Sequence, residues 1–346
     1  MTNPTFPYQG VFIRDSLSDT GSAASTGCVY QSPDIIPYGD GILSLQNAVS
    51  TYDSDIGKGL STGSSSVNYI FVRVKNLNSA NQTATVSLYR TTASLLNAPD
   101  VSGIWKQVLT GTGKQQNSLV VSGNSTTIPS EGIALTEEAF TLDGLNPPSP
   151  NDHYCLMAIV DDPDFSITIP SSWPTNSAFA SWVGNNPAVG WRNVTLYNDT
   201  SNAFSGTYQF GNINTSDETF EIIVSCNSPY LPSGTTVKIT CTDSKFPVSM
   251  SNTVSAPPSS GTQYITFIPS QKMPANFVGA LTVEIVPSAG NPIPSGLSIL
   301  FGYYQIPNSS IELDVQMARP VTFVDVTGAT HSNALVFLGA ITIVTE

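Results

Sequence analysis

The sequence predicts an all-β protein in which a loop-rich N-terminal arm precedes two antiparallel β-sandwiches. Three observations lead to this fold class. Short segments with alternating apolar and polar residues recur along the chain, which is the pattern of strands with one buried face. Turn formers separate these segments, and Gly and Pro number 26 and 25. Only 11% of the residues are charged, so Ser, Thr and Asn must supply most of the polar surface.

The order of these segments gives the domain organisation. The arm covers residues 1–64, the first sandwich 65–198 and the second sandwich 199–346, with the polar segment 198–202 at the boundary. The arm is rich in turn formers and contains short apolar runs such as 11–13. We expect it to lie over the first sandwich as an extended segment or a loop-rich edge.

In the first sandwich, residues 69–75 and 84–90 alternate strictly and are joined by a polar spacer. This predicts a hairpin of two antiparallel strands. Apolar residues of the first strand share one face, opposite to Arg73 and Lys75, and meet those of the second strand across a core. Residues 154–160 are apolar on both faces, which is typical of a strand in the centre of a sheet.

The second sandwich is expected to contain about seven strands, the number typical of an Ig-like sandwich. Turn signals separate the strand segments, and no window of helical period carries capping residues. The segments are the aromatic positions Phe204, Tyr208 and Phe210, a hairpin over 220–241, and residues 264–268, 281–285, 297–301, 321–324 and 334–344.

Four cysteines are too few for a disulfide scaffold in a chain of 346 residues. If the 220–241 hairpin is centred near Leu231, the sulfurs of Cys226 and Cys241 lie at different heights, so both are expected to be buried thiols. Spacing does not decide whether Cys28 pairs with Cys155, and this question stays open.

Four segments together resemble a known family. They are residues 68–76, 85–89, 153–161 and 185–194, in which an early strand pair, a Cys-containing core run and an Asn-Asn-Pro-Ala element follow one another. This combination is similar to the cell-adhesion-related bacterial (CARDB-type) Ig-like domains, over about residues 60–198. The resemblance implies an Ig-like sandwich with a role in adhesion or as a spacer, and it implies no catalytic residues.

Charge and hydropathy exclude several classes of function. Twelve basic and 25 acidic residues give a net charge of −13, which repels a phosphate backbone, so we expect no nucleic-acid binding. The longest apolar stretch, 334–343, has about half the length of a membrane-spanning helix, so no membrane span is expected. The first ten residues have neither a basic start nor an apolar segment. No secretory signal is therefore visible, which leaves the cytoplasm or export by a non-Sec route.

No catalytic motif is present in the sequence. The two histidines, His153 and His331, fall in different predicted sandwiches, and no Gly-x-Ser-x-Gly, Walker or His-Glu-x-x-His sequence occurs. Neighbouring acids such as Asp15 and Asp19 rarely face each other across a sugar, as a glycosidase requires. The sequence therefore predicts a protein that is not an enzyme and that has no cofactor.

Two acidic corners are candidates for a calcium site. They contain Asp161, Asp162 and Asp164 in one case, and Asp53 and Asp55 in the other. Clustered carboxylates and turn carbonyls are the ligands that Ca²⁺ prefers. The alternative is that these aspartates cap turns by accepting hydrogen bonds from their own backbone.

The leading hypothesis is a structural or interaction protein that assembles with copies of itself or docks on a larger protein assembly. Low charge and apolar strands near both chain ends favour this function. The expected contact residues are Val11, Phe12 and Ile13 near the start, and Leu335 and Phe337 near the end.

The alternative hypothesis is a carbohydrate-binding, lectin-like module with a glycan as its partner. Such a module stacks exposed aromatic rings on sugar rings beside Asp and Asn side chains. Its candidates are Trp105, Trp173, Trp182 and Trp191, for which packing in a core is the competing interpretation.

Overall fold

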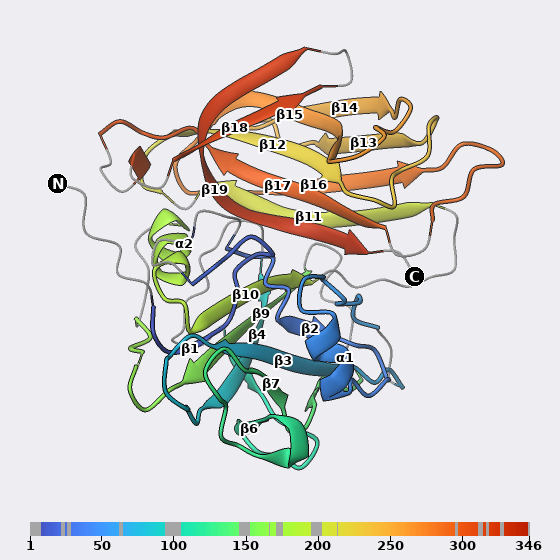
Figure 1. Cartoon of the computed structure of the whole chain (residues 1–346). Coiled ribbons are helices and arrows are strands. Elements are labelled where there is room, and N and C mark those ends of the chain that lie inside the picture. Colours follow the sequence, from blue (N-terminus) through green and yellow to red (C-terminus); the bar gives the residue numbers. More distant parts are fainter. Residues whose placement is uncertain are drawn as a thin grey trace.

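The computed structural model describes residues 8–21, 25, 29–61, 65–93, 105–144, 153–165, 167–170, 176–194, 203–212, 214–294, 297–310, 314–315, 318–325 and 329–344. It confirms the all-β fold class, since the described residues form nineteen strands and only two α-helices. Their sheets are antiparallel and pack as sandwiches. The first half of the chain (residues 8–194) forms the lower lobe of Figure 1 and the second half (residues 203–344) the upper lobe.

The first half contains ten strands that pair in one network. The strand order is β1-β3-β7-β6-β4-β9-β10, with β2 and β8 on β3 and β5 on β4. The elements are β1 (Val11–Phe12), β2 (Ile35–Pro37), α1 (Leu45–Ser50), β3 (Tyr69–Asn76), β4 (Thr85–Ala93), β5 (Lys106–Val108), β6 (Gln116–Val120), β7 (Ile133–Thr136), β8 (Phe140–Thr141), β9 (His153–Asp161), α2 (Asn176–Gly184) and β10 (Val189–Val194), with a 3-10 turn at Ser122–Asn124.

The predicted hairpin of residues 69–75 and 84–90 is wrong in its pairing. Both strands exist as β3 and β4, but β7 and β6 lie between them in the strand order. Their apolar faces meet across the core of the first half, as the alternation predicted. The central position of β9 is confirmed, because it pairs with β4 on one side and β10 on the other.

The segment 29–37 connects the two ends of this network. The backbone N–H of Ser32 donates to Trp191 O (3.0 Å), and the N–H of Asn193 donates to Tyr30 O (3.1 Å), so this segment occupies the outer edge of β10. The chain then continues into β2, which pairs with β3. The N-terminal part of the chain is therefore built into the first half as an integral layer.

The second half is a sandwich of two sheets. A four-stranded sheet has the order β11-β16-β13-β14, and a five-stranded sheet has the order β15-β12-β17-β19-β18. Buried apolar side chains from both sheets form the core between them. The strands are β11 (Phe204–Asn212), β12 (Glu218–Cys226), β13 (Thr236–Cys241), β14 (Val248–Thr253), β15 (Gln263–Met273), β16 (Phe277–Val286), β17 (Ser298–Gln305), β18 (Arg319–Val324) and β19 (Thr330–Val344).

The predicted 220–241 hairpin is wrong as well, because β12 and β13 belong to different sheets and face each other across the core. Cys226 and Cys241 are nevertheless buried free thiols, as predicted. Cys155 is also buried, and its thiol donates to Asn193 Oδ1 (2.8 Å). Cys28 lies outside the described residues.

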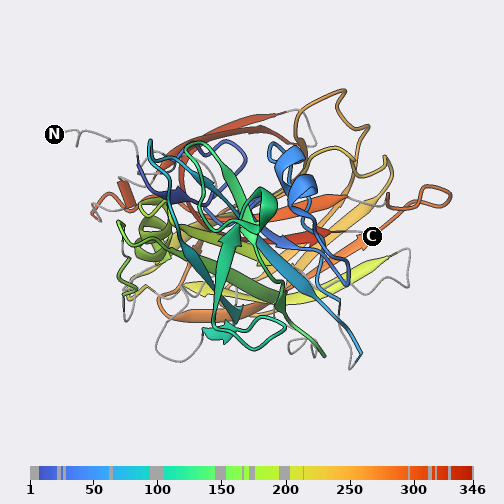
Figure 2. The same cartoon turned by 60° about the horizontal axis from the view of Figure 1, so that its bottom comes forward.

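The two halves meet through an aromatic layer, which we call the junction cluster. Helix α2 and strand β10 contribute to it from the first half, and β17 and β19 from the second. In Figure 2 the first half lies in front of the second. The members used below are Tyr30, Trp105, Met157, Phe179, Trp182, Trp191, Leu300 and Phe337. The predicted boundary at 198–202 stays a prediction, because residues 195–202 lie outside the described residues.

Candidate functional site

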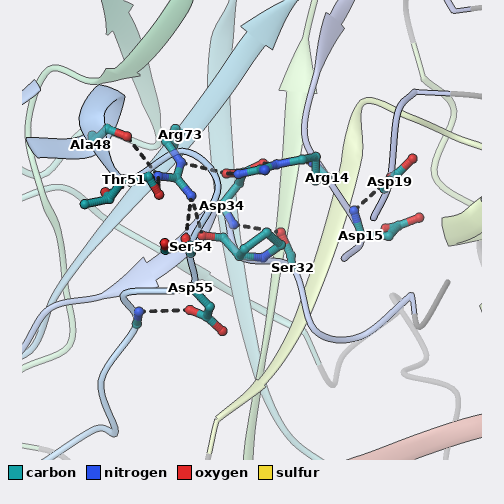
Figure 3. Close-up of polar contacts among 12 residues, drawn as sticks. Arg14, Asp15, Asp19, Ser32, Asp34, Ala48, Thr51, Ser54, Asp55 and Arg73 are labelled. Atoms are coloured by element: carbon teal, nitrogen blue, oxygen red, sulfur yellow. Dashed lines mark hydrogen bonds and ion pairs between the residues drawn. The ribbon is translucent and has the colours of Figure 1, made fainter. Parts of the chain in front are cut away.

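A buried ionic network attaches the N-terminal segment to the first half (Figure 3). Arg73 on β3 is fully buried, and its Nε donates to Asp34 Oδ1 (2.7 Å). Its Nη1 donates to the carbonyl oxygens of Ala48 (2.8 Å) and Thr51 (2.9 Å) at the end of α1. Its Nη2 reaches the carbonyl oxygens of residues 33 and 54. Arg73 was correctly predicted on the face opposite the core, but that face is covered by the N-terminal segment.

Asp34 accepts hydrogen bonds from two arginines at once. Arg14 binds it in bidentate geometry, with Nε 2.8 Å from Oδ2 and Nη2 2.7 Å from Oδ1. Burial disfavours the charged form of Arg14, but the hydrogen bond and charge of Asp34 outweigh it and raise the pKa of Arg14. The guanidinium of Arg14 also lies 3.5 Å above the ring centre of Tyr52.

A third arginine completes the attachment. Nη1 of Arg192 on β10 donates to Ser32 O (2.9 Å) and forms an ion pair with Asp55 Oδ1 (2.9 Å). Three of the five arginines of the chain therefore hold the same N-terminal segment. Their donors are directed at carbonyl and carboxylate oxygens of this chain, which is a structural use of charge.

A pair of acidic residues lies beside this network. Asp15 is buried, and its backbone N–H donates to Asp19 Oδ2 (3.0 Å). Burial and then the charge of Asp19 raise the pKa of Asp15 well above its usual range. Burial raises the pKa of Asp19 too, although the backbone N–H groups of Asp15 and Gly21 oppose it.

The predicted calcium candidates are used to hold the backbone. Asp162 accepts from the backbone N–H groups of Val11 (2.9 Å) and Asp164 (3.0 Å), and Asp55 accepts from Gly57 N–H (2.9 Å) besides Arg192. The contacts from Asp164 and Gly57 match the turn-capping alternative, whereas the contact from Val11 joins two distant segments of the chain. Asp161 accepts from Gln116 Nε2 (3.3 Å). The part of the chain that the structure describes contains no group of three Asp, Glu, His or Cys side chains arranged to hold a metal ion, and neither Asp53 nor Asp164 belongs to one.

The predicted contact residues near the N-terminus lie inside the molecule. Val11, Phe12 and Ile13 are at most 2% exposed. Ile13 packs so closely on β10 that a Cβ at Gly190 would lie 2.7 Å from its Cδ1. An apolar run predicts burial correctly, but here the covering partner is the chain itself. These three residues therefore form no outer surface.

The two predicted residues near the C-terminus also have partners within the chain. Leu335 is 1% exposed and packs with Ile223 and Phe323 on the outer face of the five-stranded sheet. Phe337 is half-buried in the junction cluster, where its ring stacks on Tyr30 at a centroid distance of 3.7 Å. Phe337 thus makes a contact between two parts of one chain.

The aromatic and histidine candidates are placed as follows. Trp105 and Trp191 are buried and Trp182 is half-buried, all in the junction cluster, as the core-packing interpretation predicted. Trp173 lies outside the described residues. The ring of His331 stacks on Phe323 and its Nε2 lies 2.8 Å from Asp325 Oδ2. His153 is the first residue of β9.

The edges of the second half differ in how they are protected against pairing with another strand. Strand β18 carries Arg319 and Pro320, and β15 carries Pro269, Lys272 and two irregularities in its register with β12. Proline, lysine and bulges discourage strand addition. Strand β14 has none of these, but it lies beside β15, where an Asn252 side chain donates to Thr266.

Strand β11 forms the opposite edge of the four-stranded sheet. It pairs with β16 in unbroken register over all nine residues, and it contains neither a charged residue nor proline. Among the described residues, no strand pairs with its other side. Among the described strands of the second half, β11 is therefore the edge with the least protection. The edge position of β11 was not predicted, because edge or centre depends on long-range pairing.

Hydroxyl side chains follow one row across the outer face of this sheet. The row runs through four strands in register, from Thr207 to Thr282, Thr240 and Ser249. The hydroxyls of Thr207 and Thr282 lie 2.9 Å apart and form a hydrogen bond. Val278 and Val286 on β16 are 58% and 41% exposed at the two ends of this face. Lys238 and Glu284 share this face, and their side-chain charges lie 3.4 Å apart and offset each other.

Comparisons with known proteins add little to these observations. No family model matches the chain, and no curated protein matches it. Three solved structures share local likeness: a red sea bream transglutaminase (13% identity, TM-score 0.23), the secreted serine protease VesC of Vibrio cholerae (6%, 0.20) and the Enterococcus faecalis MSCRAMM ACE (9%, 0.20), described as binding its ligands by a collagen hug.

The aligned parts cover 70%, 68% and 83% of this chain and 28%, 46% and 93% of those proteins. This chain thus spans less than half the length of the transglutaminase and of the protease. TM-scores of this size carry no argument about function. In the described residues, no helix is long and apolar enough to cross a membrane.

Proposed function

We propose that this chain is a non-enzymatic structural protein that docks on other protein subunits, either copies of itself or members of a larger assembly. The observation that carries the proposal is the unprotected, uncharged edge of β11 beside a neutral, hydroxyl-rich sheet face. Long edges without lysine, proline or bulges are templates for strand addition, and soluble proteins usually block them.

The use of charge elsewhere in the chain supports the same function. Arginines that an enzyme would direct at a substrate are directed here at backbone carbonyls and at Asp34 and Asp55. They hold the N-terminal segment on the first half. Attachment of the N-terminal segment by buried ion pairs suits a building block that has to present its edges in a constant orientation.

The test is the mass of the purified chain in solution. Size-exclusion chromatography with light scattering across micromolar concentrations should give species heavier than the monomer, which become more abundant as concentration rises. Negative-stain micrographs should then contain repeating assemblies. A strict monomer at all concentrations contradicts self-assembly, and a chain that stays monomeric until a second protein subunit is added supports docking on that subunit.

A further inference from the structure

We propose that the partner strand of β11 is β11 of a second copy, paired antiparallel about a two-fold axis at Thr207. This inference rests on the proposed function and names its partner and register. The order of residues in β11 carries it. The strand reads Phe204-Ser-Gly-Thr-Tyr-Gln-Phe-Gly-Asn212, and its first seven residues are nearly symmetric about the central threonine.

The register about Thr207 matches residue types that favour each other across strands. Phe204 faces Phe210 of the second copy, and aromatic pairs are among the favourable cross-strand contacts. Gly206 comes opposite the position of Tyr208, so the pair places no second bulky residue beside the glycine. Ser205 comes opposite the position of Gln209 in the same register.

The alternation of β11 agrees with this arrangement. Phe204 and Phe210 pack against the core of the second half, whereas Ser205 is exposed and Thr207 is bonded to Thr282 on the outer face. Pairing about Thr207 therefore brings core side chains together on one face and hydroxyls on the other. A shift of the register by one residue would place Phe204 opposite Gln209 and lose this match.

The two-fold axis also continues the hydroxyl row. In each copy the row runs through Ser249, Thr240, Thr282 and Thr207. Joined at Thr207, the two rows become one row of eight hydroxyl side chains across an eight-stranded sheet, with the strand order β14-β13-β16-β11 in each copy. An isologous contact of this kind closes on itself and gives a dimer.

Charge permits this contact at close range. The seven paired positions contain no charged residue, so two copies bring no like charges into direct opposition. Seven paired residues span about 24 Å, which is a small contact, so the dimer is expected to dissociate on dilution.

The first test is a cysteine at the two-fold axis. Side chains directly opposite each other in antiparallel strands have Cβ atoms about 5 Å apart, so Thr207→Cys should form a disulfide-linked dimer under mild oxidation. The matched control is Ser251→Cys, which lies on the outer face of the same sheet but on β14. Rapid cross-linking of Thr207→Cys, with none for Ser251→Cys, supports the inference. If both variants cross-link equally, or if neither does, the inference is wrong.

The second test places two like charges at the axis. Thr207→Lys should raise the dimer dissociation constant by about tenfold or more, because the two ammonium groups oppose each other. Ser251→Lys adds the same charge to the same sheet and should leave the constant unchanged. Dissociation constants come from sedimentation velocity, with circular dichroism to verify that both variants fold.

The outcomes separate this inference from the function on which it rests. If the chain assembles but neither substitution at Thr207 has an effect, assembly stands and the β11 register is wrong. If the chain is monomeric alone and in mixtures with other subunits, both are wrong. Cross-linking through Thr207→Cys remains decisive even if Thr207→Lys fails to fold.

Discussion

Loss of Arg73 provides the sharpest test of the buried ionic network. Arg73→Met keeps an unbranched apolar stem but removes every guanidinium donor. Asp34 would keep Arg14, whereas the carbonyls of Ala48 and Thr51 would lose the donor that Arg73 provides. Removing one member of a buried ion pair costs about 3 to 5 kcal/mol of unfolding free energy. For a unit of this size, the loss corresponds to a fall of Tm of about 6 to 20 °C.

The same strand supplies a matched control. Lys75 is two residues further along β3, where its ammonium lies 2.7 Å from Glu131, whose side chain is 66% exposed. An exposed ion pair contributes little, so Lys75→Met should change the unfolding free energy by at most about 1 kcal/mol. Arg73→Lys should lie between the two, because an ammonium keeps the charge beside Asp34 but lacks the planar fork that reaches several carbonyls.

Tryptophan fluorescence is the appropriate assay for this comparison. All four tryptophans precede residue 195, so their emission reports on the first half. Urea unfolding gives the midpoint and slope for each variant. Limited proteolysis around residues 51–58 should accelerate in Arg73→Met as the N-terminal segment detaches. If Arg73→Met and Lys75→Met unfold at the same urea concentration, the network does not stabilise the first half and the reasoning is wrong.

Four further predictions follow from the described contacts. Burial and the charge of Asp19 raise the pKa of Asp15 above its unfolded value, so the stability present below about pH 4 is lost as pH rises through the folded pKa. Asp15→Asn should therefore be more stable than the native chain at neutral pH and equally stable under acid. Parallel urea midpoints of the two proteins from pH 4 to 8 would contradict this. Phe337→Ala should separate the unfolding of the two halves into two calorimetric transitions, because it removes most of the apolar side chain that packs on Tyr30 and leaves a cavity between the halves. Phe337→Leu keeps most of that apolar volume and should keep one transition, and one unchanged peak in both variants would argue against coupling. Calcium or a chelator should leave Tm unchanged, because both carboxylate oxygens of Asp162 already accept hydrogen bonds from backbone N–H groups. A rise of Tm with calcium would indicate a calcium site. Added salt should strengthen the dimer, because it screens the long-range repulsion between two copies that each carry a net charge of −13. Weaker association in salt would indicate that ion pairs hold the copies together.

The sequence predicted the fold class and several strands because alternation is a local signal. β3, β4 and β9 are recognisable from period-two burial and from an apolar run buried on both faces. Strand partners were not predictable in the same way. β3 and β4 are neighbours in sequence, yet two other strands separate them, because the polar spacer permits a crossing between layers as readily as a tight turn. The resemblance to CARDB-type domains stays a prediction.

The candidate site was only partly visible in the sequence for a related reason. An apolar run such as Val11–Phe12 predicts burial but does not identify the covering surface, which here is the chain itself. Arg73 was expected on an outward face, and only the tertiary path of the N-terminal segment buries that face. A signal was nevertheless present, since an arginine within a strand of buried residues in a chain with 11% charged residues is unusual.

The junction cluster connects the ionic network to the orientation of the β11 edge. Tyr30 belongs to the segment that the network attaches to β10, and its ring stacks on Phe337 of β19. β19 pairs with β17 in the sandwich whose other sheet ends at β11. Detachment of the N-terminal segment should therefore make the angle between the two halves more variable, while the structure of the β11 edge stays unchanged. Arg73→Met is thus expected to keep the dimer while small-angle scattering records a broader distribution of shapes, and loss of the dimer would place the contact on the first half instead.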